Sequence, residues 1–302
     1  MTQSKRRDRP GKQYPIKSSA KSAPGPKADH SGETRRSQVA AKSANESARI
    51  PASEPLQSGK DRFWLYGWHA VTAALRNPAR KKFRLLATEG NIKPLNEQLS
   101  GHKLQPETVD TARLNSILPS GAVHQGLALL TQPLPEPSLE QLCVRPEGAE
   151  PLLVVVLDQV TDPQNAGAIL RSCAAFGATA LILTGHHAPP ATGVLAKAAS
   201  GALELTPLLR AGNLARTLEQ LAARGFWLIG LASEAERPVS DIDLSGNIAI
   251  VLGAEGSGLR QLTARKCDFL ARLPTRGKLA SLNVSNAAAI ILYEAARRRG
   301  GV

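Results

Sequence analysis

The stretch LLVVVL at residues 152–157 decides the fold, because six consecutive apolar residues are typical of a strand that is covered on both faces. Three further apolar runs follow it, at residues 180–183, 226–231 and 248–252. Segments with helical spacing separate the runs, near residues 166–176, 214–223 and 259–266. This alternation predicts an α/β fold with a doubly wound, mainly parallel sheet over residues 150–302. Ligands of such sheets bind at the carboxyl ends of the strands, so the candidate site is expected in the loops there.

A smaller α/β domain is expected ahead of this sheet, over residues 61–132. Its strand-like stretches lie at residues 63–67, 83–87 and 126–130, and its helical segments at residues 68–76 and near 92–99. Between the two domains, residues 133–149 contain four prolines and Gly148. Because proline removes a backbone donor and interrupts both helices and central strands, this segment is predicted to be a linker without either.

The first 60 residues differ in composition from the rest of the 302-residue chain. They hold 13 of the 38 Lys and Arg residues but only 5 of the 25 Asp and Glu residues, so 8 of the 13 net positive charges lie there. Their apolar residues are too scattered to offset the entropy lost on ordering, which predicts a disordered basic tail over residues 1–60. Such a tail either raises the affinity for RNA by displacing counterions or only keeps the chain soluble.

Composition also excludes several classes of protein. No apolar run approaches the roughly 18 to 20 residues that cross a bilayer, and the N-terminus lacks the apolar stretch of a signal peptide, so a membrane or secreted protein is not expected. The three cysteines, Cys143, Cys173 and Cys267, form no CxxC pair, which favours the cytoplasm and argues against a structural zinc site. His186-His187 has no third ligand at helical spacing, so no metal is predicted.

The first polar loop is DPQNAGAILR at residues 162–171, directly after the first apolar run. Asn165 opens a helix there, and Arg171 points away from the apolar face of that helix. Its guanidinium is then free to reach the edge of the sheet, where its planar fork suits a phosphate. The alternative is that Asn165 only caps the helix and Arg171 is only a solvated charge.

The second polar loop is LGAEGSGL at residues 252–259, a glycine-rich turn between a strand and a helix. Such a turn brings backbone groups close to a cofactor. Its glycines read GxxGxG, so it is neither the GxGxxG dinucleotide fingerprint nor a P-loop. Glu255 at its tip suits a hydroxyl, an amine or a cation better than a phosphate.

The third polar loop, LPTRGKLASLNVSNAAAI at residues 273–290, runs into an alanine-rich helix. The order DPQNxGAIxR, LGAEGxGL and SLNVSxAxxI resembles the SpoU (TrmH-like) family of RNA ribose 2'-O-methyltransferases, over residues 152–299. YGWHAV at residues 66–71 and HQGLA at residues 124–128 resemble the N-terminal substrate-binding domain of that family. The two-domain arrangement is most similar to the branch that methylates a guanosine of 23S ribosomal RNA.

The resemblance implies a fold, a cofactor and an assembly. Members of the family have a doubly wound α/β fold with a C-terminal trefoil knot, use S-adenosylmethionine and act as homodimers. In this sequence, the positions that match the catalytic and substrate pocket are Asn165, Arg171, Glu255, Ser281 and Asn283. Those expected to hold the cofactor through backbone atoms are Gly253, Leu273 and Leu282. Thr275 and Asn286 depart from the usual pattern of the family, so the resemblance does not define the shape of the cofactor pocket.

The resemblance also implies roles for individual side chains. Arg171 would orient the ribose and its phosphate rather than act as a base, because a guanidinium with a pKa above about 12 stays protonated. The apolar stripe of Ala287, Ile290 and Ile291 would be buried in the core or at a two-fold contact.

Other functions fit parts of the pattern. Within the family, transfer RNA is an alternative substrate. A non-catalytic RNA-binding or ribosome-assembly protein could share the scaffold, although binding alone would not need Asn165, Arg171, Glu255 and Asn283 together. A nicotinamide-dependent oxidoreductase is disfavoured because GxGxxG is absent. Neither DNA nor a membrane is expected as a partner.

Overall fold

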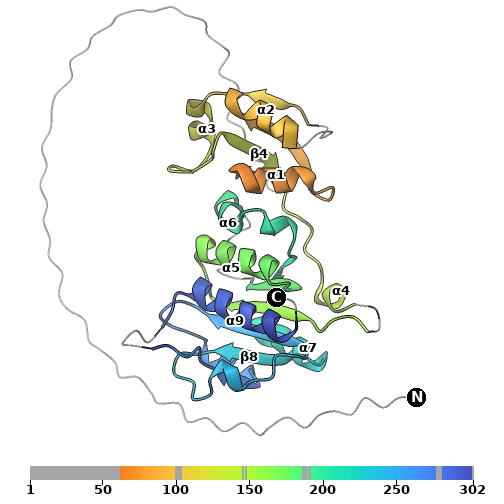
Figure 1. Ribbon diagram of the computed structural model, residues 1–302, viewed down its shortest axis with the longest axis vertical. Helices are drawn as coiled ribbons and strands as arrows, with labels where there is room; N and C mark the ends of the chain where they lie inside the picture. Colours follow the sequence, from red (N-terminus) through yellow and green to blue (C-terminus); the bar gives the residue numbers. More distant parts are fainter. Residues whose placement is uncertain are drawn as a thin grey trace, which may run out of the picture. The chain divides into compact units, whose positions relative to one another are not determined.

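The computed structural model describes residues 62–98, 104–144, 146, 148–185, 189, 192–276 and 281–300 (Figure 1). The predicted tail over residues 1–60 and the pair His186-His187 lie outside the described residues. Within the described part, no helix has the length and apolar character that crossing a membrane requires.

A six-stranded sheet with the order β10-β8-β9-β5-β6-β7 forms the larger part of the fold. All of its neighbouring strands are parallel. The strands are β5 (Leu153–Asp158), β6 (Ala180–Thr184), β7 (Leu208–Ala211), β8 (Trp227–Leu231), β9 (Ile248–Gly253) and β10 (Phe269–Ala271). The four apolar runs are therefore strands, and the predicted parallel α/β sheet is confirmed. The run that opens the domain is β5, which is buried along its whole length between β9 and β6.

Helices cover both faces of this sheet, as doubly wound folds require. Residues of α5 (Pro163–Ala175), α6 (Gly193–Ala199) and α9 (Val284–Arg298) share one apolar core with Leu153, Val155 and Leu157 of β5. Residues of α4 (Leu139–Cys143) and α7 (Leu214–Ala223) share a second core with Val154 and Val156. The alternation of side chains along β5 thus feeds two cores. Figure 1 shows α5 and α9 side by side, and α7 lies on the other face, with α8 (Gln261–Lys266) against it.

The smaller sheet has the order β1-β4-β2-β3. Its elements are β1 (Phe63–Tyr66), α1 (Trp68–Arg76), β2 (Lys82–Ala87), α2 (Glu89–Gln98), β3 (Pro106–Thr108), α3 (Thr111–Ile117) and β4 (Leu127–Thr131). β4 pairs antiparallel with β1 and β2, whereas β3 pairs parallel with β2. The sequence did not predict β3 or α3. Asp110 fixes the start of α3, since its side chain accepts a hydrogen bond from Arg113 N.

A short helix, α4, lies inside the segment that was predicted to be a linker without helices, so that prediction was wrong. The four prolines of the segment all lie outside α4 and leave room for one turn. Ser138 and Gln141 form a capping box at its start, with Gln141 N donating to Ser138 Oγ at 3.2 Å and Ser138 N to Gln141 Oε1 at 2.8 Å. Two backbone donors are satisfied in this way, and Leu139 is buried against the sheet.

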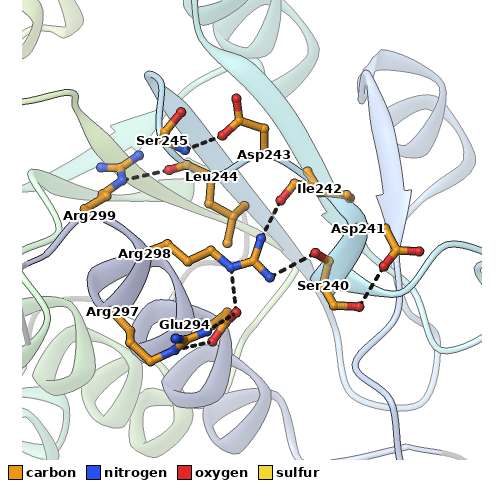
Figure 2. A network of polar contacts seen from close by, with 10 residues as sticks. All are labelled: Ser240, Asp241, Ile242, Asp243, Leu244, Ser245, Glu294, Arg297, Arg298 and Arg299. Atoms are coloured by element: carbon orange, nitrogen blue, oxygen red, sulfur yellow. Dashed lines mark hydrogen bonds and ion pairs between the residues drawn. The ribbon is translucent and has the colours of Figure 1, made fainter.

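The C-terminal helix α9 is fastened to the loop that follows β8 (Figure 2). Arg298 donates to the backbone oxygens of Ile242 at 2.9 Å and Ser240 at 3.0 Å, and its Nε donates to Glu294 at 2.6 Å. Arg299 donates to the backbone oxygens of Leu244, Gly246 and Pro151 at 2.9, 2.6 and 3.0 Å. These two arginines satisfy carbonyl groups of residues 240–246, so they hold α9 in place rather than face a ligand.

Candidate functional site

Three loops meet at the carboxyl edge of the large sheet. β5 and β9 are neighbours, with Asp158 opposite Gly253, so the loops after them emerge side by side. Asn283 Nδ2, from the third loop, donates to Asn165 Oδ1 at 3.2 Å and lies 3.3 Å from Glu255 Oε2. One residue from each polar loop thus joins a single cluster, the edge trio of Asn165, Glu255 and Asn283. The sheet topology brings together side chains that are up to 118 positions apart in the sequence.

Local structure fixes the orientation of the two amides in the edge trio. The helix cap of α5 is Asp162, whose Oδ1 accepts from Gln164 N at 3.0 Å, so the alternative that Asn165 is only the cap is wrong. Asn165 lies in the first turn and is free to accept from Asn283. Asn283 caps α9, because its Oδ1 accepts from Ser285 N at 2.9 Å. The carbonyl end of this amide therefore serves the helix, and the NH₂ end points to Asn165 and Glu255.

A pocket of about 330 Å³ adjoins the edge trio. Five of the expected site residues line it, namely Gly253, Glu255, Leu273, Ser281 and Leu282. The remaining walls come from the end of β8 and residues 232–234 after it, from the glycine-rich loop at 254–258, and from the start of α9, together with Leu252, Ala271 and Thr275. The three residues expected to hold a cofactor thus share one pocket, whose size falls within the range of small-molecule sites.

Gly253 is required by the loop itself. Ala254 N donates to Gly258 O at 3.1 Å, and Gly258 N donates back to Ala254 O at 2.9 Å, which closes residues 254–258 into a tight turn. A Cβ on Gly253 would clash with the carbonyl of Gly258 and with Leu259 N. The sequence suggested a glycine for close approach to a ligand. The structure adds a second reason, because the loop backbone already occupies that space.

Arg171 forms no hydrogen bond with the edge trio in the part of the chain that the structure describes. It lies on α5 with its side chain exposed, whereas Ile169 and Cys173 on the same helix are fully buried. This orientation, away from the apolar face, agrees with the sequence prediction. Among the described residues, no hydrogen bond or ion pair engages its guanidinium, which leaves both edges of the fork open to a ligand.

A buried carboxylate that the sequence analysis missed supports the same edge. Asp158, the last residue of β5, is fully buried and accepts from Arg260 Nε at 2.7 Å and from Arg260 N at 3.0 Å. Arg260 follows the glycine-rich loop, so this pair holds the end of the loop that carries Glu255 against β5. The signal was available, since an aspartate that ends a fully apolar strand needs a partner once buried.

The remaining candidates have structural explanations. Cys173 is buried in the core, and burial raises the pKa of its thiol, so the thiol is inert. Over the described ranges, no group of three or more His, Cys, Asp or Glu residues is placed to hold a metal ion.

The fold and the site define a class: an α/β domain that binds a small ligand in loops at the carboxyl edge of a parallel sheet, joined to a smaller α/β module. Two family models match the sequence in this order. The model described as RNA 2'-O ribose methyltransferase substrate binding matches residues 64–137, and that of the SpoU rRNA Methylase family matches residues 152–293. The chain belongs to the SpoU rRNA methylase family, and the resemblance seen in the sequence is confirmed.

Curated relatives match along nearly their whole length. The 23S rRNA (guanosine-2'-O-)-methyltransferase RlmB of Coxiella burnetii is 41% identical over 242 residues, which cover 78% of this chain and 95% of the relative. The protein of the same name from Pseudomonas putida is 40% identical over 242 residues, covering 78% and 96%.

Solved structures agree. The crystal structure of the SpoU methyltransferase AviRb from Streptomyces viridochromogenes in complex with AdoMet has a TM-score of 0.68 at 26% identity, covering 79% of this chain and 91% of that one. A crystal structure of an RNA 2'-O ribose methyltransferase has a TM-score of 0.67 at 28% identity, covering 79% and 89%.

Proposed function

We propose that this protein transfers a methyl group from S-adenosylmethionine to the ribose 2'-hydroxyl of a guanosine in 23S ribosomal RNA. The observation that carries the proposal is the pair of relatives bearing this activity in their names, each about 40% identical and matched over at least 95% of its length. The edge trio and the adjoining pocket supply the site. The cytoplasm, where ribosomal RNA is modified, is the compartment that this substrate implies.

The backbone of the glycine-rich loop lines the pocket of about 330 Å³, and these backbone groups suit S-adenosylmethionine as a ligand. Gly253, at the end of β9, and Leu273 and Leu282, from the loop between β10 and α9, would hold the cofactor there. S-adenosylmethionine, when bound, supplies a methyl group on a sulfonium. The apolar side chains of the pocket would exclude water from that group, and the backbone of the glycine-rich loop would offer donors and acceptors for its polar parts.

The residues of the chain would prepare the nucleophile. A ribose 2'-hydroxyl is a weak nucleophile that must be aligned and must lose its proton. Arg171 would bind the neighbouring phosphate with its open fork and remain protonated, so the proton passes to that phosphate or to a water molecule. The edge trio and Ser281 would fix the ribose with neutral donors and one carboxylate. Glu255 orients Asn283, which in turn faces Asn165.

Two alternatives remain within this scaffold, a transfer RNA substrate and a non-catalytic RNA-binding or ribosome-assembly role. The named substrate of the curated relatives favours ribosomal RNA. The edge trio beside a small-molecule pocket favours catalysis, because RNA binding alone needs no such pocket.

We also propose that the C-terminal segment forms the trefoil knot of the family. Leu273, Ser281 and Leu282 line the same pocket as residues 232–234 after β8, and Arg298 and Arg299 clasp residues 240–246 of that same loop. The end of α9 is therefore bonded to a loop that precedes it by 53 to 58 residues.

A homodimer is the assembly that we propose, on the exposed face of α9. Within the apolar stripe that the sequence predicts on this helix, Ile291 is buried in the core, whereas Ile290 is 46% exposed. Tyr293 is 49% exposed, and its ring packs edge-on against Phe176 of α5 at 5.8 Å between centroids. A second copy would cover this apolar face. Light scattering tests it: Ile290→Glu should yield monomers, and a wild-type monomer with full activity would exclude the dimer.

Methyl transfer in vitro tests the activity directly. A 23S rRNA transcript incubated with S-adenosylmethionine should gain one 2'-O-methylguanosine, detected by mass spectrometry of the nucleosides. Modification of transfer RNA alone would favour the first alternative, and no modification of either RNA would favour the second.

A further inference from the structure

Two polar contacts join the smaller module to the segment of α6 and the 3-10 turn Ala202–Glu204. The first is the junction pair, Arg80 and Glu204, whose side chains are 1% and 4% exposed. Arg80 donates to both carboxylate oxygens, at 2.5 and 3.2 Å, and to Gln132 O at 2.7 Å. Asn77 donates to Glu204 at 2.7 Å. The hydrogen bonds of this pair thus go to other protein groups, and its two charges neutralise each other.

The second contact, between Lys197 and Gln125, leaves donors of the ammonium unused. Lys197 on α6 donates from Nζ to Gln125 Oε1, and the same oxygen accepts from Trp68 N at 3.1 Å. Gln125 is exposed and Lys197 half-buried. An ammonium has three donors, and this contact uses one of them. Within the described part of the chain, no carboxylate pairs with Lys197, and partial burial lowers the pKa of its ammonium.

The loop that presents Gln125 is held in an uncommon backbone conformation. Gln125 has a φ of 53°, in the left-handed region that non-glycine residues seldom adopt. Asn91 Nδ2 donates to Gln125 O at 2.8 Å, and this contact supports the conformation. Backbone outliers held in place by surrounding contacts cluster at binding and catalytic sites.

α6 contacts this loop through Lys197 and also packs on α5, the helix that carries Asn165 and Arg171. It packs closely on α5, where a Cβ on Gly167 would lie 2.5 Å from Leu195 O and 2.6 Å from the Cβ of Ala198. Gly167 falls between Asn165 and Arg171 in the sequence. α6, which carries Lys197, thus contacts both the smaller module and the helix that carries Arg171, and an RNA strand that binds both would run beside it.

From these contacts we infer that Lys197, with Gln125 beside it, binds a backbone phosphate of the RNA where the strand passes from the smaller module to the catalytic edge. The inference rests on the proposed function for the identity of the ligand. A phosphate would supply the counter-charge that the described protein groups do not, and a lysine suits it as a point charge. Gln125 would hold the ammonium in place between encounters with RNA.

Salt-dependent binding of a 23S rRNA hairpin transcript tests the inference. Replacing one phosphate contact lowers the slope of log affinity against log salt concentration by about 0.7 to 0.9. Lys197→Gln should show this decrease and several-fold weaker binding, with unchanged affinity for S-adenosylmethionine, and Lys197→Arg should restore the slope. An unchanged slope in Lys197→Gln would overturn the inference.

Two further variants separate phosphate binding from a merely structural contact. Glu204→Gln loosens the junction but removes no exposed cation, so its slope should equal that of the wild type; an equal decrease in Glu204→Gln and Lys197→Gln would overturn the inference. Gln125→Glu gives Lys197 a carboxylate partner, which should weaken RNA binding if the ammonium serves a phosphate. Unweakened binding would mean that the contact only joins the modules.

Failure of this inference and failure of the proposed function give different results. Failure of the wild-type protein to methylate any 23S transcript would refute the proposed function, whereas the salt slopes report on the phosphate contact alone.

Discussion

The junction pair and the edge trio are both polar clusters built from distant parts of the chain, yet they differ in what surrounds them. Arg80 and Glu204 are almost wholly buried, and protein groups satisfy them at short distances. In the edge trio, Glu255 is exposed, Asn165 and Asn283 are half-buried, and the contacts are longer, at 3.2 and 3.3 Å. A cluster that satisfies itself stabilises the fold, whereas one that keeps spare donors and acceptors near a pocket can bind a ligand.

The comparison predicts the largest effect on activity for Arg171, whose guanidinium has no hydrogen-bond or ion-pair partner among the described residues. Arg171→Ala should lower the methylation rate by several powers of ten, about 3 to 5 kcal/mol, because both orientation and charge stabilisation are lost. Binding of S-adenosylmethionine, measured by calorimetry, should not change. Arg171→Lys serves as the matched control and should rescue poorly, since an ammonium lacks the planar fork. A near-normal rate for the lysine variant would contradict the proposed role.

The closed cluster should instead affect stability. Arg80→Met leaves the buried Glu204 carboxylate without its hydrogen-bonded cation, so the free energy of unfolding should fall by about 3 kcal/mol in urea denaturation. The double variant Arg80→Met with Glu204→Leu removes the buried charge as well and should recover much of that loss. If Arg80→Met unfolds at the wild-type urea concentration, the junction pair is not the structural contact described here.

Asn283 belongs to both categories, because one end of its amide caps α9 and the other faces the edge trio. Asn283→Ala should reduce the free energy of unfolding by about 1 kcal/mol, the usual value of a helix cap, and should also lower the methylation rate. Asn283→Ser retains a capping oxygen but not the NH₂ group, so it should restore stability without restoring activity. Equal recovery of both properties would show that the amide acts only as a cap.

The smallest effect is expected from Glu294, which pairs with Arg297 and Arg298 at the end of α9. Hydrogen bonds from Arg297 and Arg298 lower the pKa of Glu294. Because the pKa is lower in the folded state, the stabilisation is present above the unfolded pKa and is lost as the pH falls through the folded value. Glu294→Gln should therefore destabilise the protein by less than about 1 kcal/mol at pH 7. The difference from the wild type should vanish in thermal unfolding at acidic pH, and a difference that persists there would contradict this explanation.

The long, regular features of the fold could be predicted from the sequence. The four apolar runs became strands, and the helix over residues 214–223 has the predicted bounds. β7, β10 and α6 were missed because they are short and their apolar residues show no clear period, so tertiary contacts decide them. α4 was missed because prolines on both sides concealed a capping box.

The site could be predicted only as far as local motifs reach. The three loops were recognisable, and the parallel order of β5 and β9 explains why their residues meet. The Asp158–Arg260 pair joins positions 102 residues apart, and the junction pair 124, so neither leaves a local signal. Whether a polar residue is satisfied depends on neighbours of this kind, and the distinction between closed and open clusters therefore required the structure.

The central claim, that this protein methylates a guanosine ribose of 23S ribosomal RNA, is tested most directly by mapping 2'-O-methylated positions in ribosomal and transfer RNA from cells with and without the gene. We predict the loss of a single 2'-O-methylguanosine from 23S rRNA, restored by the wild-type gene and not by Arg171→Ala. An unchanged 23S rRNA methylation pattern, or a loss confined to transfer RNA, would contradict the account.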